Sequence, residues 1–231
     1  MKIRITFISD THTKHKQCEM DLPGGDILIH SGDFMNSGYY WNEASSFLEW
    51  YDGLHQYDNK ILIAGNHDRW FEDNMKEIPK LMEMYPNIKY LLDQQTEIFG
   101  LKIWGSPWQP EFCNWAFNLE RNGEDLREKW FWIPSDCDIL VTHGPSMGNL
   151  DISGAPYNTP NLGCELLRER IDVVKPLIHC FGHIHGSAGY KFDGNTHHFN
   201  ASILNERYHY QNRPMTIDLD LETREIEFKD E

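Results

Sequence analysis

The residues in this chain best suited to chemistry are metal-binding types, and they occur in five short segments. Each segment combines Asp, Asn or His with a neighbouring Gly or Thr, and the five are Asp10-Thr11-His12, Gly32-Asp33, Gly65-Asn66-His67-Asp68, Thr142-His143-Gly144 and Gly182-His183-Ile184-His185. Carboxylate and amide oxygens mixed with imidazole nitrogens suit first-row transition metals better than Ca²⁺ or Mg²⁺. The segments together supply enough donors for two cations if one carboxylate is shared.

Each segment follows an apolar run that is typical of a β-strand. The runs are Ile3 to Ile8, Ile27 to Ile29, Ile61 to Ile63, Ile139 to Val141 and Leu177 to Phe181. Five strand ends in sequence predict one site assembled along the edge of a sheet. Asp10 and His12 are two residues apart, so in extended chain both side chains point to one side, and His183 and His185 repeat this spacing.

Each segment taken alone also has an ordinary structural interpretation. Gly32-Asp33 is common turn chemistry, Asn66 or Asp68 could cap a helix N-terminus, and His143 before Gly-Pro could be a core histidine. The joint occurrence of all five segments, each after a strand, favours the metal site over these alternatives.

The chain alternates strand-like and helical patterns and then ends in hairpins. Strands are expected at 3–8, 27–30, 60–64, 88–92, 96–99, 101–105, 138–142, 177–181, 188–192, 195–200, 214–220 and 224–228, and helices at 43–54, 74–84, 123–131 and 163–174. Asp193-Gly194 is a strong hairpin signal. This order predicts a mixed α/β sandwich rather than a purely parallel sheet. Residues 106–122 and 144–162 form the longest irregular stretches, and such loops are often functional.

Length and composition bound the class of protein. A chain of 231 residues with 40% hydrophobic content predicts one globular domain over 1–231. It has no apolar run of about 20 residues, as a membrane span needs, and its N-terminus lacks a signal-peptide pattern. Five scattered cysteines favour a reducing, cytoplasmic location.

The net charge of −15 argues against binding to extended nucleic acid or anionic membranes. A homodimer is expected from base rates alone.

The order of the five segments resembles the calcineurin-like metallophosphoesterase superfamily. Three further stretches, 105–110, 114–117 and 138–145, resemble the branch of the brain metallophosphoesterase-domain proteins. The resemblance covers most of the chain. It implies a four-layer α/β/β/α sandwich, in which two mixed sheets are flanked by helices and the metals lie at strand ends.

The resemblance also implies roles for individual residues. One metal ion would be held by Asp10, His12, Asp33 and His185. The other would be held by Asp33, Asn66, His143 and His183, so that Asp33 is the bridge. His67 matches the catalytic histidine beside the metals, and Asp68 would orient it by accepting a proton from its ring. Two divalent transition-metal ions are expected, with Mn²⁺ first and Fe, Zn, Ni or Co as alternatives.

The expected reaction is phosphoester hydrolysis. Two cations about 3.5–4 Å apart would hold a bridging hydroxide that attacks phosphorus, while His67 protonates the leaving oxygen. The phosphoprotein phosphatases of the superfamily carry Arg just after the bridging Asp, whereas residues 33–38 here read Asp-Phe-Met-Asn-Ser-Gly. Without that clamp a dianionic monoester loses bidentate recognition. A small phosphodiester, with cyclic nucleotides among the candidates, is therefore the first choice of substrate. A phosphomonoesterase, a nuclease and a non-catalytic metal-binding scaffold are the alternatives.

Other aromatic and histidine residues keep two interpretations each. The segment from Trp104 to Trp115 could stack on a nucleobase or aryl group, or could pack its loop against the core. Tyr39, Tyr40 and Trp41 could frame the pocket or cover a helix start. Six further histidines are placed outside the site: His30, His55 and His179 are expected to pack or lie at the surface, and His197, His198 and His209 are left unassigned.

Overall fold

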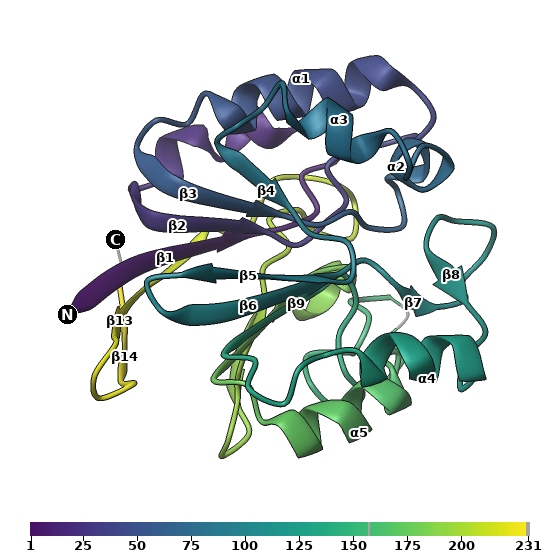
Figure 1. The fold of residues 1–231 in the computed structure, drawn as a ribbon. Coiled ribbons are helices and arrows are strands. Elements are labelled where there is room, and N and C mark those ends of the chain that lie inside the picture. The colour runs from purple at the N-terminus through teal and green to yellow at the C-terminus, as the bar shows by residue number, and fades with distance from the viewer. Residues whose placement is uncertain (157, 230–231) are drawn as a thin grey trace.

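Two six-stranded sheets dominate the computed structural model, which describes residues 1–156 and 158–229 (Figure 1). The first sheet has the strand order β14-β13-β1-β2-β3-β4. Its strands are β1 (Lys2–Ile8), β2 (Gly25–His30), β3 (Tyr57–Leu62), β4 (Ile88–Tyr90), β13 (Met215–Asp220) and β14 (Ile226–Phe228). β1 to β4 run parallel, and β13 and β14 add an antiparallel edge.

The second sheet has the order β11-β12-β10-β9-β6-β5. Its strands are β5 (Gln94–Ile98), β6 (Leu101–Ser106), β9 (Ile139–Thr142), β10 (Ile178–Phe181), β11 (Gly189–Phe192) and β12 (His197–Asn200). The central four are parallel, and β5 and β11 are antiparallel edges. Two short strands, β7 (Gln109–Pro110) and β8 (Asn118–Leu119), pair within the irregular stretch 106–122.

Helices cover the outer face of each sheet, which gives the expected four-layer sandwich (Figure 1). The first sheet carries α1 (Trp41–Asp52), α2 (Arg69–Asp73) and α3 (Ile78–Met82), and the second carries α4 (Glu124–Phe131) and α5 (Glu165–Val174). Three 3₁₀ turns complete the helical elements: η1 (His15–Gln17), η2 (Glu19–Asp21) and η3 (His185–Ser187). None of the helices in the described part of the chain is long and apolar enough to cross a membrane.

The layers follow from the alternation of side chains along each strand. In β2, Ile27 and Ile29 pack into the core between the two sheets, whereas Leu28 packs toward α1. The inter-sheet core also receives Ile103 from β6 and Val141 from β9. Because both sheets bury apolar side chains in one shared layer, the strand ends of one sheet lie next to those of the other.

Every run predicted as a strand contains one, but the helix predicted at 74–84 is confirmed only in part. Within that range the structure has one short helix, α3, and α2 ends just before it. Pro79 lies in the first turn of α3. Proline lacks an amide N–H and is tolerated only in a first turn, so a continuous helix through Pro79 would lose a hydrogen bond and clash.

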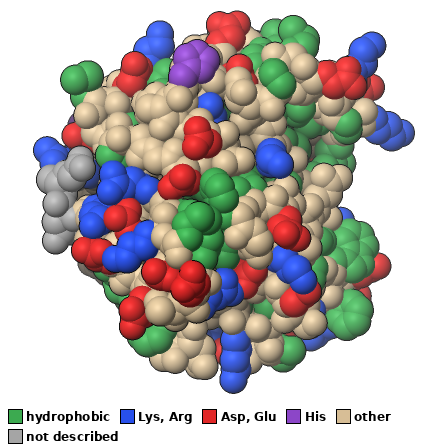
Figure 2. Space-filling view, turned by 60° about the vertical axis from the view of Figure 1, so that its left-hand side comes forward, with side chains coloured by type: hydrophobic (Ala, Val, Ile, Leu, Met, Phe, Trp, Pro, Cys, Tyr) green, Lys and Arg blue, Asp and Glu red, His purple; other side chains and the backbone are tan. Residues whose placement is uncertain are grey.

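Charges of both signs are interspersed on the face shown in Figure 2, where the edge strands β13 and β14 lie near the termini. Lys2 pairs with Glu227 at 3.1 Å, and Arg4 pairs with Asp218 at 2.9 Å. Ion pairs near the surface stabilise a protein little, about 0–1 kcal/mol each.

Candidate metal centre

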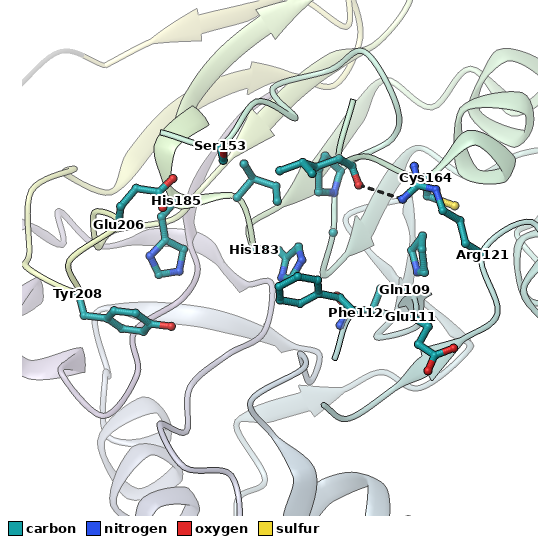
Figure 3. Close-up of a pocket in the computed structure, with 15 residues that line it drawn as sticks. Gln109, Glu111, Phe112, Arg121, Ser153, Cys164, His183, His185, Glu206 and Tyr208 are labelled. Atoms are coloured by element: carbon teal, nitrogen blue, oxygen red, sulfur yellow. Dashed lines mark hydrogen bonds between the residues drawn. The ribbon is translucent and has the colours of Figure 1, made fainter. Parts of the chain in front are cut away.

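The five chemistry-bearing segments emerge from the carboxyl ends of five strands. Asp10, Asp33 and Asn66 follow β1, β2 and β3 of the first sheet, whereas His143 and His183 follow β9 and β10 of the second. The expectation of a single sheet edge is therefore wrong, because two sheets contribute. The sheets are joined at this point, since the His183 backbone N–H donates to the Asp10 carboxylate at 3.0 Å. His183 and the nearby His185 border a cavity (Figure 3).

The backbone turns sharply at several of these positions. Asp10, His12, Asp33 and His183 have φ angles of 53°, 40°, 58° and 68°. These values lie in the left-handed region, which non-glycine residues rarely adopt and which costs about 1–3 kcal/mol per residue. The expectation that Asp10 and His12 project from extended chain is therefore wrong. The side chains converge because the loops reverse direction directly after the strands.

Two of the segments need a glycine because a neighbouring side chain lies too close to the backbone to leave room for a Cβ atom. At Gly32, φ is +101°, and a Cβ would lie 2.7 Å from His143 Nδ1. At Gly182, a Cβ would collide with the Asp10 carboxylate. A side chain at either position would push a donor atom out of place.

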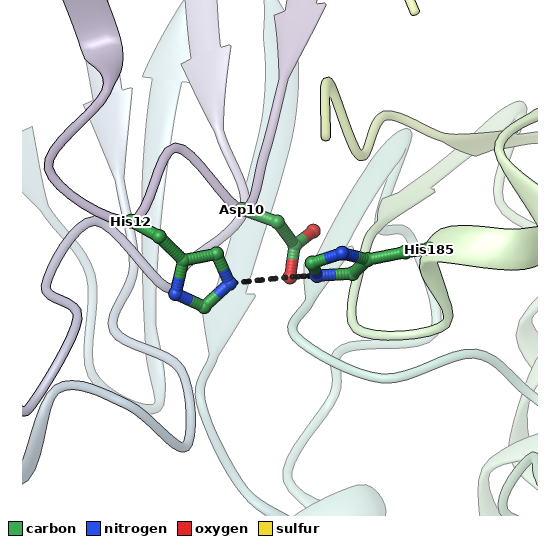
Figure 4. Close-up of side chains that lie close together, drawn as sticks. All are labelled: Asp10, His12 and His185. Carbon is green, nitrogen blue, oxygen red and sulfur yellow. Dashed lines mark ion pairs between the residues drawn. The ribbon is translucent and has the colours of Figure 1, made fainter. Parts of the chain in front are cut away.

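Asp10 lies between two imidazoles (Figure 4). Its Oδ1 is 4.0 Å from His12 Nε2 and 3.4 Å from His185 Nε2. Both rings are oriented by their other nitrogen: His12 Nδ1 donates to the Met35 carbonyl, and His185 Nδ1 donates to the Asn205 carbonyl, each at 3.1 Å. Such bonds fix the tautomer, so that Nε2 of each ring is available as a metal ligand.

Asp33 stands between this group and a second one. Its Oδ2 lies 3.7 Å from His12 Nε2 and 3.4 Å from His143 Nε2. His143 Nε2 is also 2.9 Å from Asn66 Oδ1, and His143 Nδ1 donates to a backbone carbonyl. Ligand atoms of Asp33, His143 and His183 all lie within 4.8 Å of one another, as do those of Asp10, His12 and His185. The seven predicted ligands are thus brought together, with the Asp33 carboxylate between the two groups.

The donor set fits divalent cations. His12 Nε2 is buried and has no hydrogen-bond partner among the described residues. Burial lowers the pKa of His12 to about 4 and that of His183 to about 3, which keeps both rings neutral. Burial would raise the pKa of Asp10 and Asp33, but the surrounding histidines outweigh it and hold both below the usual value. Burial would also lower the pKa of His143 and His185, but the neighbouring Asp33 and Asp10 carboxylates raise that of His143 to about 9 and that of His185 above its usual value. A cation that binds here would therefore displace protons from these two rings.

His67 lies beside this centre and is held on two sides. Its Nδ1 donates to the Asn36 carbonyl at 2.7 Å, which leaves Nε2 as the other ring nitrogen. Its ring stacks on Trp115, with centroids 4.1 Å apart and planes inclined by 27°. A ligand atom of His67 also lies within 4.8 Å of donors of His12 and Asp33. Unlike the predicted ligands around it, which are largely buried, His67 is half-buried and accessible to solvent.

Asp68 does not orient His67, and that expectation is wrong. Its buried carboxylate accepts backbone N–H groups of Gly65, Asp33 and Met35 at 2.7, 2.9 and 2.9 Å. These bonds tie the loop after β2 to the loop after β3. Asp68 therefore fixes the position of Asp33, while the Asn36 carbonyl performs the orienting role first assigned to Asp68.

The aromatic segment divides between packing and the site. Trp104 is buried in the core under α4 and α5, and Trp108 donates to Asp93 at 2.8 Å. Trp115 stacks on His67. Phe112 is exposed, and its ring centroid lies 6.3 Å from that of His183. In the group Tyr39, Tyr40 and Trp41, Trp41 is the first residue of α1. Its ring centroid lies 4.8 Å from that of Trp70, so it covers a helix start. Tyr39 and Tyr40 are exposed.

Three contacts at the centre were not predicted from the sequence. The Tyr208 ring lies 4.8 Å from that of His12, and its hydroxyl points into the cavity in Figure 3. Ser202 Oγ donates to Asp10 Oδ2 at 2.7 Å, and Asn36 contributes its carbonyl to His67. Tyr208 and Ser202 lie in the irregular stretch after β12, where no spacing pattern marks them.

The fold and the arrangement of this centre define a class of protein. The sequence profile of the calcineurin-like phosphoesterase family matches residues 3–187. This range contains all five segments. The chain belongs to the calcineurin-like phosphoesterase family.

Individual relatives agree with this assignment. The chain is 41% identical to metallophosphoesterase domain-containing protein 1 of Homo sapiens, over 94% of this chain and 71% of that protein. It is 37% identical to UPF0046 protein C25E10.12 of Caenorhabditis elegans, over 95% of this chain and 82% of that protein. Among solved structures, TT1561 of Thermus thermophilus has a similar fold, with a TM-score of 0.67 and 16% identity over 99% of both chains.

Proposed function

We propose that this protein is a metal-dependent phosphodiesterase that hydrolyses small phosphodiesters. The observation that carries the proposal is the position of the Asp33 carboxylate between His12 and His143, at 3.7 and 3.4 Å. A shared carboxylate flanked by imidazoles from two sheets is what a pair of adjacent cations needs. Mn²⁺ is the proposed native ion, since mixed N and O donors accept first-row metals and availability selects among them.

Two divalent cations at this centre would supply charge stabilisation of the phosphoryl oxygens and a nucleophile from water at neutral pH. The protein's own groups do the positioning. Asp68 fixes the loop that carries Asp33, and the Met35 and Asn205 carbonyls orient His12 and His185. Ligand loops already held in place need little rearrangement to bind, which is the basis of preorganised catalysis.

His67 is the proposed acid that protonates the leaving oxygen. Its Nδ1 proton is committed to the Asn36 carbonyl, so the transferable proton belongs on Nε2. The stacked Trp115 restricts rotation of the ring, and partial exposure lets His67 recover a proton from solvent. General acid catalysis by a positioned group typically contributes about 10²–10⁴-fold.

Preference for a diester is supported by the basic side chains near the centre, because each of them is already bound to another group of the protein. Lys14 donates to the Tyr208 carbonyl, and Arg69 is bound to Glu72 and to a backbone carbonyl. Arg121, which lines the adjoining cavity, is paired with Glu165 at 2.9 Å. A monoester dianion normally requires an uncommitted bidentate cation, whereas a diester carries a single charge.

The test compares bis-p-nitrophenyl phosphate with p-nitrophenyl phosphate, using metal-free protein with and without added Mn²⁺. We expect turnover only with metal and a higher kcat/KM for the diester. Metal content measured in the same samples should approach two ions per chain. Inactivity with Mn²⁺, Fe²⁺, Zn²⁺, Ni²⁺ and Co²⁺ despite bound metal would favour a scaffold, and a preference for the monoester would replace the diester assignment.

A further inference from the structure

A cavity adjoins the metal centre on the side of His183 and His185 (Figure 3). Its volume is about 280 Å³. Its walls come from the two long irregular stretches, which contribute Phe112 and Leu162, and from the segment that contains Tyr208. Ligand pockets commonly measure about 300–1,000 Å³, so this cavity has room for one small organic group and not for a polymer.

The cavity is lined by apolar side chains and by two acidic residues. Phe112, Pro145 and Leu162 supply apolar surface, whereas Glu111 and Glu206 supply carboxylates. In Figure 3 these two carboxylates lie on either side of His183 and Phe112. Glu206 is held in place, because its Oε1 accepts the Gly154 backbone N–H.

Arg121 is the one Lys or Arg side chain among the described residues that line this cavity, and it is already committed. Its guanidinium donates to the Gly163 carbonyl at 2.6 Å and pairs with Glu165. It also contacts the Leu162 carbonyl at 3.5 Å. Glu111 and Glu206 are exposed residues that border the cavity, so an anionic group in it would lie near two carboxylates without an available Lys or Arg to offset them.

We infer that this cavity receives one organic substituent of the phosphodiester and selects a small, uncharged substituent, with Glu111 and Glu206 excluding anionic ones. The inference rests on the proposed function. The single phosphoryl charge belongs at the metal centre, where cations attract it. A second negative charge on the substituent would lie among the carboxylates and be repelled. The favoured substrates are diesters whose alcohol parts are neutral, such as aryl or nucleoside groups without further phosphates.

The experiment uses two symmetrical diesters of similar size whose para substituents differ in charge, bis(p-carbamoylphenyl) phosphate and bis(p-carboxyphenyl) phosphate. Because each is symmetrical, either orientation places the test group in the cavity. With the Mn²⁺-loaded enzyme we expect kcat/KM to be about tenfold higher for the carbamoyl ester, after correction for the uncatalysed rates. The double variant Glu111→Gln/Glu206→Gln should bring the ratio close to one, since Gln keeps the size and the acceptor oxygen.

A matched control removes two exposed acids away from the cavity, in the variant Glu83→Gln/Glu97→Gln. It changes net charge equally and should keep the tenfold ratio. In the wild type, added salt should reduce the ratio without any mutation. A wild-type ratio of one, or an equal loss of the ratio in both double variants, overturns the inference while the proposed function stands. Failure to hydrolyse any diester with bound metal overturns both.

Discussion

Two groups of buried histidines lie in this protein, and they differ in what their ring nitrogens face. At the metal centre, His12 Nε2 has no hydrogen-bond partner among the described residues and faces the carboxylates of Asp10 and Asp33. In the second group, His179 Nε2 bonds to Thr142 Oγ1 at 2.8 Å, and its Nδ1 is 3.2 Å from His198 Nδ1. His198 Nε2 then bonds to Asp193 at 3.1 Å.

The difference follows from position along the strand. His179 and His198 are paired residues of β10 and β12, so each ring is held by its neighbour in the sheet. His183 lies beyond the end of β10, where the chain can turn and bring its ring to other loops. Burial of a histidine is therefore not the mark of a metal site. What distinguishes His12 is a buried ring nitrogen that has no hydrogen-bond partner among the described residues and lies close to two carboxylates.

The largest effect is expected from Asp33→Asn, which removes the shared charge at the metal centre. An amide cannot bridge two cations as a carboxylate does, so metal content should fall below two ions per chain. Loss of several kcal/mol of charge stabilisation corresponds to a fall in kcat/KM of about 10³-fold. Metal analysis and diester hydrolysis measure the two effects. Full metal occupancy with normal turnover would remove the bridge assigned to Asp33.

His67→Ala should reduce turnover by about 10²–10⁴-fold while both ions stay bound. The loss should be greatest for diesters with poor leaving groups, because a good leaving group needs little protonation. Trp115→Ala keeps the acid but removes the stacked ring, and should cost about tenfold or less. Parallel metal analysis checks occupancy. Normal turnover in His67→Ala, or loss of metal on that substitution, contradicts the acid role.

Asp193→Asn tests the second histidine group and should have the smallest effect. Metal content and turnover should stay at wild-type values, while the free energy of unfolding falls by about 1 kcal/mol. For a chain of this size that shift lowers Tm by about 2–4 °C. Reduced metal content in this variant would erase the distinction between the two histidine groups.

The effect of Asp193→Asn on the free energy of unfolding should also depend on pH. Burial acts to raise the pKa of Asp193, but bonds from backbone N–H groups and His198 outweigh it and lower the pKa from 3.8 to about 2. The ionised carboxylate is favoured by folding, so its contribution is complete well above pH 3.8 and is lost as pH falls toward 2. Urea unfolding of metal-free wild type and variant should show a smaller difference at about pH 3 than at about pH 6.

Much of the site could be predicted from the sequence because its residue types are chemically specific. The five segments, their positions after strands and the four-layer sandwich all agree with the structure. The ligand roles of the individual side chains stay predictions, although the structure brings the side chains together. The helix predicted at 74–84 is shortened at its start, because Pro79 is tolerated only in the first turn of α3.

The role of Asp68 could not be read from sequence for a different reason. A carboxylate next to a histidine suggests a pair, but adjacent residues commonly point in different directions. Asp68 turns inward to three backbone N–H groups, and His67 turns outward to Asn36 and Trp115. Tyr208 and Ser202 were missed because their proximity to the centre depends on where the chain returns after β12.

The sequence by itself determined the donor types, their order and the strands that deliver them, because apolar periodicity and metal chemistry are properties of short segments. The tertiary structure alone decided which atoms meet. Packing of two sheets against one core brought β9 and β10 beside β1 to β3, and left-handed turns aimed the side chains. Contacts between residues far apart in the chain depend on that packing, which no local pattern specifies.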